Sequence, residues 1–497
     1  METNGFSSGI RGPVYAAIVR VALLTMALGG CGSSGADIGQ RMDQAREQRA
    51  AGELRAASIE LKNVLQADPE HAEARLLLGR VYVEMDDGAS AEKELRRAAN
   101  LGQPASATAY WRARALGLQG DNERLLEEIE VAEDWPAETR ARVAALRARA
   151  HLALGDVEAA RDELGRAEEL GAGELETRLA RVRLALATDR VEEAREQAAA
   201  TTEAFPQSAR AWQLRARSAM VAGDLAAADE HLGRAIEHAF APDIEHLMRA
   251  QVRMSQGRTE AAREDVEWLS ERAPDNPRVR FVRGQLAWAS GEPDEACAHF
   301  GEAVAAAPGM REARYYAGVC HYRDGEYNQA ESDLLEAYQG RAAPAVARVL
   351  GATYLAQERY ARAREVIRPV LQNNPDDTGA LVLAAELENA TGNTSRAIEH
   401  LRRLAELRPD DPGVRLSLGV GLFRSGEVEA GQGALGEALT LEPGLRQAGA
   451  LLVMSQIRQE QHEKALSTAR SLAERQPEAP LPRTLEGLAH VAMGDAD

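Results

Sequence analysis

The chain is poor in lysine and in aromatic residues, and each shortage excludes a class of protein. Aromatic residues make up 4% of the 497 residues while 45% are apolar, which excludes an aromatic-rich globular core and favours one of alanine and leucine. Lysine occurs only at Lys62, Lys93 and Lys464, which excludes a binding site built on a clamp of lysines. The net charge is −19, so that no nucleic-acid partner is expected. Runs that alternate between polar and apolar residues are missing as well, which argues against β-strands.

No group of serine, cysteine, histidine or carboxylate residues predicts catalysis. Residues 431–436 match the string of a dinucleotide-binding loop, but they fall within a predicted helix and no strand precedes them. His231 and His238, with His246 following, stand about two helical turns apart, whereas a zinc site favours i, i+4 pairs. Surface or interhelical histidines are therefore favoured, and we expect no enzyme activity, no cofactor and no metal.

A small residue returns at an almost constant interval along the chain. Successive copies lie 34 residues apart, except for one interval of 35 and one of 33, and a period of this size is typical of stacked helical hairpins. We call these positions the anchors. They are Ala57, Ala91, Leu125, Ala160, Ala194, Ala228, Ala262, Ala296, Ala330, Ala363, Ala397, Gly431 and Ala465.

Other positions of the unit repeat with the anchors. Glycine recurs five residues before the anchor, where a turn between helices needs it, and proline recurs twelve residues after it, where a helix can end. Twelve residues before the anchor, a second small residue lets the two helices of a hairpin approach closely. This residue is Gly79, Gly284, Gly318, Gly351 or Gly419 in five of the units. Because one hairpin cannot bury its apolar face alone, we predict one continuous all-α solenoid over residues 38–497.

These positions resemble the tetratricopeptide repeat (TPR), which has Leu-Gly at positions 7 and 8, tyrosine at 11 and alanine at 20. The residues that match in one unit are Leu78, Gly79, Tyr82 and Ala91. The resemblance implies a right-handed superhelix of stacked antiparallel helix pairs, with 13 repeats and a truncated last one. The pattern is weakest over residues 103–139, which we still interpret as a repeat.

The last helix is predicted to lack a partner. The chain ends at Asp497, where a turn should lead into another second helix. We therefore expect the apolar face formed by Leu485, Leu488 and Val491 to be uncovered.

The N-terminal residues predict secretion. Residues 21–30 form a ten-residue apolar run behind Arg11 and Arg20, which is too short to span a bilayer and is typical of a signal peptide over residues 1–30. The sequence Leu28-Gly29-Gly30-Cys31 that ends the run resembles the bacterial lipoprotein signal motif. This resemblance implies that Cys31 is acylated and becomes the first residue of the mature protein, the alternative being an ordinary signal peptide with an incidental cysteine.

The residues after the cysteine predict where the anchor lies. Residues 31–37 are expected to form the lipid anchor and a flexible tether of small and polar residues. The lipoprotein family retains proteins at the inner membrane when aspartate follows the cysteine, whereas Gly32 stands here. The resemblance therefore implies attachment to the outer membrane, facing the periplasm.

Two further cysteines fall in neighbouring repeats. Cys297 lies on the second helix of one predicted hairpin and Cys320 on the first helix of the next. An oxidising periplasm allows a disulfide between them, but the sequence does not give the Cα separation that such a bond requires. Two small buried hydrophobic side chains are the alternative.

An aromatic patch is predicted on the groove that the first helices line. The TPR resemblance implies that positions 2, 5, 9 and 12 of each repeat face this groove. Phe281 and Trp288 occupy positions 5 and 12 of one repeat, and Tyr315 and Tyr322 occupy them in the next. We predict that these four residues form a patch that contacts a peptide or a sugar, with packing between adjacent first helices as the alternative.

A narrower resemblance rests on the lipoprotein signal followed by residues 57–65, 73–79 and 91–98, together with residues 313–330. These segments are similar to the TPR-repeat lipoprotein of the PEP-CTERM/exosortase system. The resemblance implies a non-catalytic periplasmic scaffold that binds proteins during protein sorting and exopolysaccharide export. Two alternatives remain, a targeting or regulatory arm of an enzyme whose catalytic part lies beyond residue 497, and a general assembly factor of the outer membrane.

Overall fold

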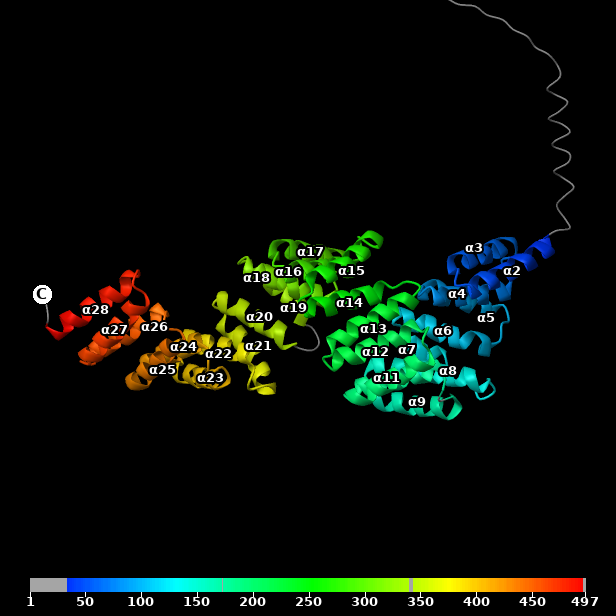
Figure 1. Ribbon diagram of the computed structural model, residues 1–497. Helices are drawn as coiled ribbons and strands as arrows, with labels where there is room; N and C mark the ends of the chain where they lie inside the picture. Colours follow the sequence, from blue (N-terminus) through cyan, green and yellow to red (C-terminus); the bar gives the residue numbers. More distant parts are fainter. Residues whose placement is uncertain (1–33, 172, 339–342, 495–497) are drawn as a thin grey trace, which may run out of the picture. The chain divides into compact units, whose positions relative to one another are not determined.

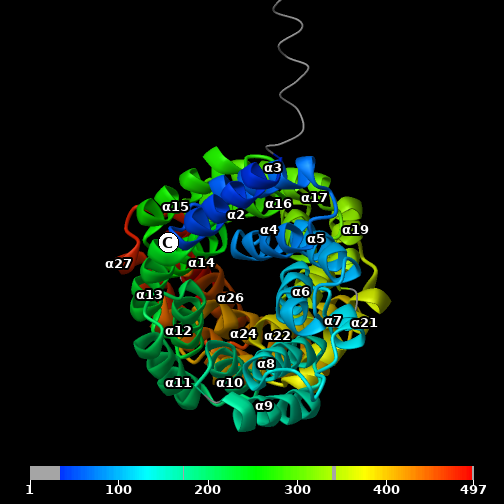
Figure 2. The same ribbon diagram turned by 90° about the vertical axis from the view of Figure 1, so that its right-hand side faces the viewer.

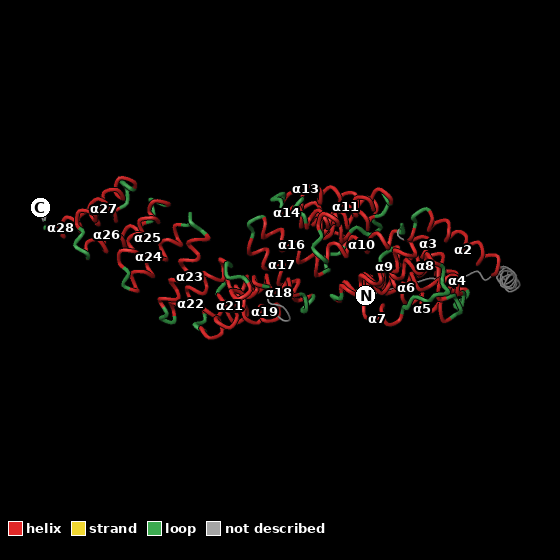
Figure 3. The backbone as a smooth tube through the Cα atoms, turned by 90° about the horizontal axis from the view of Figure 1, so that it is seen from below, coloured by secondary structure: helices red, strands yellow, loops and turns green. Residues whose placement is uncertain are grey.

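The computed structural model describes residues 34–171, 173–338 and 343–494, and every regular element within them is a helix (Figure 1; Figure 3). The predicted signal peptide and Cys31 lie outside the described residues. The helices form two compact units, which meet in the sequence between Arg272 and Ala273. We call them unit 1 and unit 2.

Unit 1 contains seven helix pairs. Its helices are α2 (Ser34–Ala50), α3 (Leu54–Ala67), α4 (Ala72–Glu84), α5 (Gly88–Asn100), α6 (Ala105–Gln119), α7 (Asn122–Glu128), α8 (Ala137–Leu154), α9 (Val157–Gly171), α10 (Leu175–Ala187), α11 (Val191–Ala204), α12 (Ala209–Val221), α13 (Leu225–His238), α14 (Asp243–Ser255) and α15 (Thr259–Arg272).

Unit 2 contains six helix pairs and one more helix. Its helices are α16 (Pro277–Ala289), α17 (Pro293–Ala306), α18 (Arg311–Arg323), α19 (Tyr327–Tyr338), α20 (Pro344–Ala356), α21 (Tyr360–Asn373), α22 (Thr378–Ala390), α23 (Thr394–Leu407), α24 (Pro412–Ser425), α25 (Val428–Leu441), α26 (Arg446–Arg458), α27 (His462–Arg475) and α28 (Pro480–Met493). The predicted all-α array of 13 hairpins and one unpaired last helix is confirmed.

The two helices of each pair meet at the anchor. All 13 anchors are buried. The small residue twelve positions earlier faces the side chain four positions after the anchor, and a Cβ added to Gly79 would lie 2.5 Å from Cγ of Leu95. A Cβ on Gly284 would likewise lie 2.6 Å from Cε1 of Phe300. The close approach that the sequence predicted is therefore filled by a large apolar side chain from the second helix.

The turn between the helices of a pair requires a left-handed backbone. Glycine adopts it in most repeats, for example at Gly223 with φ +77°. Asp86, Asp189, Glu358 and Glu460 take the same place with φ between 57° and 59°. The turn geometry is thus kept even where the preferred residue is absent.

Three details differ from the sequence pattern. The weak repeat is present, but its second helix α7 has only 7 residues. The predicted tether is wrong from Ser34 onward, because helix α2 begins there. At the other end Leu488 and Val491 are exposed as expected, but Leu485 is buried against Leu472 and Ala489 in the last apolar cluster.

Glycine-to-alanine changes test the close approach. Gly284→Ala is expected to lower the free energy of unfolding by about 1–3 kcal/mol, because its Cβ would overlap the Phe300 ring. Gly301→Ala in α17 is the matched control, since a Cβ there meets nothing within 4 Å. The control should be neutral or raise stability by up to about 1 kcal/mol. Urea unfolding followed by circular dichroism measures both, and equal effects would contradict this account of the helix contact.

Candidate functional site

Two of the four predicted patch residues, Phe281 and Trp288, differ strongly in exposure. Phe281 on α16 is buried and packs against Phe300 at 5.7 Å and Tyr316 at 5.6 Å between ring centroids. Trp288, one residue before the end of α16, is 38% exposed, and its ring lies 6.4 Å from that of Phe300. Phe281 is therefore a core residue, whereas Trp288 presents ring surface to solvent.

The two tyrosines of the predicted patch are half-buried on α18. Tyr315 packs edge-on against Tyr316 at 5.1 Å, and Tyr322 lies 5.8 Å from Tyr327. Both also contact the apolar cluster formed by α19 to α22. The structure thus gives each of the four predicted residues a ring neighbour outside the set, and surface remains on Trp288, Tyr315 and Tyr322.

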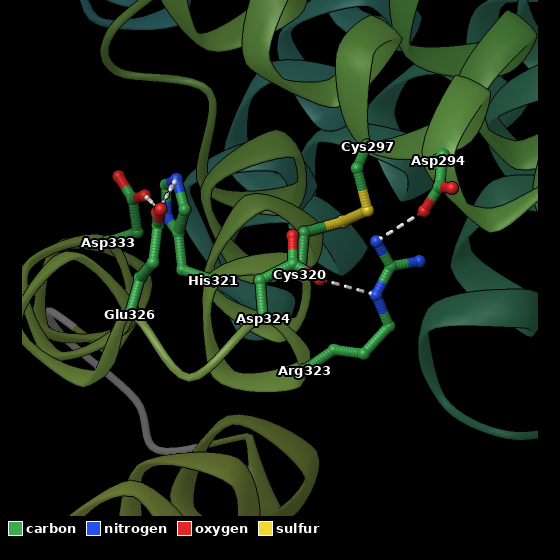
Figure 4. The surroundings of a disulfide bond; sticks show 8 residues. All are labelled: Asp294, Cys297, Cys320, His321, Arg323, Asp324, Glu326 and Asp333. Atoms are coloured by element: carbon green, nitrogen blue, oxygen red, sulfur yellow. Dashed lines mark hydrogen bonds and ion pairs between the residues drawn. A yellow bond between two sulfur atoms is a disulfide. The ribbon is translucent and has the colours of Figure 1, made fainter.

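A disulfide joins Cys297 on α17 to Cys320 on α18 (Figure 4). The Cα atoms lie 5.7 Å apart, within the range for such bonds. Beside it, the Nη2 atom of Arg323 on α18 donates to Oδ1 of Asp294 on α17 at 2.7 Å (Figure 4). Two successive repeats are therefore connected by a covalent bond and an ion pair.

Reduction of this disulfide should destabilise unit 2. The bond closes a loop with a sequence separation of 23 residues, and the chain-entropy relation for such a loop gives about 3 kcal/mol. Cys320→Ser is expected to lower the free energy of unfolding by about this amount, which urea unfolding shows as a lower midpoint. Dithiothreitol should lower the wild-type midpoint and leave that of the variant unchanged, and a wild-type midpoint insensitive to dithiothreitol would contradict the bond.

Unit 1 contains a second candidate binding surface, which its first helices form. Figure 2 looks into this unit, where first helices such as α6, α8 and α14 form an inner row and second helices such as α7, α9 and α13 form an outer row. From α4 to α12, consecutive first helices pack against one another. The row curves enough that Asp86, after α4, interacts electrostatically with Arg210 on α12 and Glu245 on α14. We call the surface of the inner row the inner face.

An arginine stands at the same position of successive repeats on this inner face. The position lies eleven residues before the anchor, which is position 9 of the repeat. The five residues, which we call the arginine ladder, are Arg80, Arg114, Arg149, Arg183 and Arg217. Arg46 occupies the same position of the first repeat but is ion-paired to Asp43 and Glu73.

The arginine ladder lacks the ion pairs that most other arginines have. Among the residues that the structure describes, none of the five has a carboxylate oxygen within 4 Å or a hydrogen-bond acceptor. Arg80 lies over the Trp111 ring at 5.5 Å, and the Nε atom of Arg80 and the Nη2 atom of Arg149 are buried without a partner. Four ladder arginines are half-buried and Arg217 is exposed. Because unpaired cations cost stability where water is partly excluded, the four half-buried arginines point to a role other than folding.

The ladder arginines repel one another. Burial and the neighbouring Arg149 lower the pKa of Arg183 to about 9, with Arg210 and Arg217 adding to the effect. Burial also lowers the pKa of Arg149, and Arg114 contributes. A bound anion would relieve this repulsion, because an opposite charge favours the charged form of each guanidinium.

One carboxylate on the inner face is held in its ionised form by neighbouring arginines. Burial alone would raise the pKa of Glu176, but Arg210 and Arg114 outweigh it and lower the pKa to about 2. The Nη1 atom of Arg210 donates to both carboxylate oxygens at 2.8 and 2.9 Å, and the Tyr110 hydroxyl donates at 2.8 Å. This brace ties α6, α10 and α12 together, and Glu176 also favours the charged forms of Arg149 and Arg183 without an ion pair to either.

Glu245 behaves differently. Its side chain is buried near the start of α14, and burial, with Asp86 and Asp243 nearby, raises its pKa to about 7. A carboxyl whose pKa is raised by folding holds more protons in the native state than in the unfolded state between pH 4.5 and 7. Stability therefore falls as the pH rises through this range.

Glu245→Gln tests this pH dependence. The variant should match the wild type near pH 4 and exceed its free energy of unfolding by up to about 3 kcal/mol at pH 8. Urea unfolding at successive pH values measures the difference. Glu260→Gln is the control, because the Glu260 side chain on α15 is 85% exposed, and the same pH-dependent gain in both variants would contradict the assignment.

The arginine ladder was missed by sequence reasoning although its signal is in the sequence. Once the repeats are aligned on the anchors, arginine at position 9 is visible in six successive units, followed by Gln251 and Gln285. What the sequence does not show is that these arginines lack carboxylate partners.

Other candidate sites gain no support from the described residues. His246 stacks on Trp268 at 4.0 Å and hydrogen-bonds Asp265 at 2.6 Å within the α14–α15 pair. Within the described ranges, no group of three histidine, cysteine or acidic residues is placed to hold a metal. None of the described helices has the length and apolarity needed to cross a bilayer. Residues 431–436 lie inside α25, as predicted.

Two sequence profiles, both described as "Tetratricopeptide repeat", match the chain and together cover more than half of it. One matches residues 179–243, 247–310 and 284–347, and the other matches residues 48–116 and 354–418. The chain is also 30% identical over 243 residues to "Cellulose synthase 2 operon protein C" of Komagataeibacter xylinus. The match covers 48% of this chain and only 16% of that much longer protein.

One solved structure shares the fold over most of the chain, and a second aligns with part of it. A chain of the structure titled "Crystal structure of APC/C hetero-tetramer Cut9-Hcn1" aligns with a TM-score of 0.51 and 14% identity, over 95% of this chain and 99% of that one. The structure titled "Functional Characterization of Pseudomonas Aeruginosa pilF" aligns with a TM-score of 0.38 and 18% identity, over 42% of this chain and 96% of that one.

Proposed function

Because the chain belongs to the tetratricopeptide repeat family, we propose that it is a non-catalytic, lipid-anchored scaffold of the bacterial cell envelope that holds protein partners on the first helices of its repeats. The observation that carries this proposal is the array itself. Within each unit, first helices of neighbouring hairpins contact one another, from α4 to α12 in unit 1 and from α18 to α22 in unit 2, and stacked repeats of this kind form extended surfaces that suit partner binding better than catalysis.

Secretion is supported by two independent features. The apolar run that ends in Leu28-Gly29-Gly30-Cys31 has the length and order of a lipoprotein signal. The Cys297–Cys320 disulfide is of a kind that persists in oxidising compartments and is rare in the cytosol. With Gly32 after the cysteine, we propose that the protein is anchored in the outer membrane through acyl chains on Cys31 and faces the periplasm.

The clients that we propose are components of PEP-CTERM/exosortase sorting and exopolysaccharide export. The resemblance of residues 57–98 and 313–330 to the TPR lipoproteins of that system supports this assignment. The relative from Komagataeibacter xylinus adds support at a coarser level, because its name refers to an operon for a polysaccharide synthase. General assembly of the outer membrane is the competing assignment, and it differs only in the clients.

Membrane fractionation tests the anchor. The wild-type protein should appear in the outer-membrane fraction, and Cys31→Ser should move it to the soluble periplasmic fraction. Globomycin, which blocks lipoprotein signal cleavage, should retain the precursor of the wild type and leave the variant unaffected. Recovery of both forms from the cytoplasm would contradict the proposed location.

Crosslinking in intact cells, followed by mass spectrometry, identifies the clients. Envelope proteins of polysaccharide export or sorting are expected, whereas outer-membrane assembly proteins would favour the competing assignment. A catalytic domain encoded in the same reading frame after residue 497 would instead favour an enzyme arm. Capture of cytoplasmic proteins alone would contradict the scaffold proposal.

Alanine substitutions test the exposed aromatic residues of unit 2. Trp288→Ala with Tyr322→Ala should reduce capture of the crosslinked client about tenfold, while the thermal midpoint stays nearly unchanged. Phe281→Ala is the contrasting control, because this residue is buried and should lose about 3–5 kcal/mol of stability. A large loss of stability in the double variant with unaltered capture would assign Trp288 and Tyr322 to the core.

A further inference from the structure

We propose that the arginine ladder of unit 1 binds an extended segment of a partner protein that carries an acidic side chain at every third residue and apolar side chains between them. This inference deepens the scaffold function proposed above and rests on it in taking the occupant to be a protein. It assigns a binding surface to unit 1, separate from the exposed aromatic residues of unit 2.

The charge on the inner face calls for an anionic ligand. The chain as a whole carries a net charge of −19, yet five ladder arginines in succession have no carboxylate within 4 Å in the described part of the chain. Most of the other described arginines have an ion pair, as in the braces of Arg210 with Glu176 and of Arg249 with Asp265. Guanidinium groups bind carboxylates strongly, through paired hydrogen bonds.

The structure also makes room for the ladder. A Cβ on Gly117 of α6 would coincide with the guanidinium group of Arg149 on α8. The absence of a side chain at this one position therefore lets Arg149 extend over the neighbouring first helix. Glycine inside a helix costs stability, and here its benefit is the placement of a cation.

The spacing of the ladder selects the form of the ligand. Packed helices lie about 8–10 Å apart, and consecutive first helices from α4 to α12 are in contact, so that neighbouring ladder arginines recur at about that distance. A polyproline II segment has three residues per turn and rises about 3.1 Å per residue, which places every third side chain on one face at about 9 Å. Acidic residues at every third position therefore match the spacing of neighbouring ladder arginines, in a segment that bends with the curved row.

Apolar side chains beside the ladder distinguish a peptide from an acidic polysaccharide. Leu152, Leu186 and Met220 follow ladder arginines by three residues, which places them on the same side of their helices, and they are partly buried. Leu118 and Val221 follow ladder arginines by four residues and are exposed. A peptide can supply apolar side chains to these positions, whereas a chain of uronic acids has none.

Direct binding to the full-length chain, purified in detergent, tests the inference. The probe is a fluorescein-labelled 15-residue peptide of five Glu-Pro-Val repeats, followed by fluorescence anisotropy. Binding is expected, and it should weaken as the salt concentration rises because surface charges are screened. The triple variant Arg149→Gln/Arg183→Gln/Arg217→Gln should weaken it at least about tenfold.

Matched controls separate the ladder from general charge effects. Arg161→Gln/Arg166→Gln/Arg195→Gln removes the same charge from α9 and α11, where these side chains are exposed, and should leave binding unchanged. A peptide of the same composition with its five glutamates placed together should bind more weakly than the repeating one, and a Gln-Pro-Val peptide should not bind.

Each contrary result overturns a defined part of the inference. Equal binding of the repeating and the block peptide would show that the ladder does not require an acidic residue at every third position. Ladder-dependent binding of polygalacturonate fragments, without binding of the peptide, would replace the protein segment by an acidic polysaccharide. Equal losses in the two triple variants, or no binding of any anionic probe, would overturn the ladder as a site. The crosslinking and fractionation experiments decide the scaffold function separately.

Discussion

The close contact between the two helices of each pair is the constraint on which the rest of the structure depends. A small residue on the first helix meets a large apolar side chain of the second, as Gly79 meets Leu95 and Gly284 meets Phe300. This contact repeats along the chain and fixes the angle at which each pair stacks on the next. Because the same contact recurs every 34 residues, the groove positions of successive repeats also come into line. The arginine ladder is a consequence of that alignment.

The inner face of unit 1 illustrates how a solenoid separates stability from binding. The anchors and the apolar residues around them lie between helices and stabilise the fold without contacting a ligand. Position 9 is free of this task, so that unpaired arginines are tolerated there despite their cost. The Glu176–Arg210–Tyr110 brace lies among them and holds three first helices in place. Rigid support for a set of unsatisfied charges is the arrangement expected of a preformed binding surface.

Much of the fold could be predicted from the sequence, because the 34-residue period of anchors, turn residues and prolines has a direct structural cause at each position. The limits are equally specific. Residues 34–37 read as a tether because they are small and polar, yet the first turn of α2 includes them. Phe281 read as a groove residue from its register, but the bulk of its ring is accommodated against Phe300 and Tyr316. The position of a residue in the repeat does not by itself determine whether a large side chain faces the groove or packs into the core. The pairing of Cys297 with Cys320 depends on a Cα separation that only coordinates supply, and the lack of partners around Arg149 and Arg183 depends on every neighbouring helix.

The disulfide has a consequence for how the chain responds to force. In a solenoid each repeat contacts only its neighbours, so that unravelling can proceed from an end, one hairpin at a time. The bond between α17 and α18 lies across the boundary of two successive hairpins, and in a chain that is pulled open from α28 the tension passes through the sulfur atoms instead of through residues 298–319. Tension from a client held on unit 2 would therefore extend the chain by less than its full length, because the segment between Cys297 and Cys320 stays closed as long as the bond is oxidised.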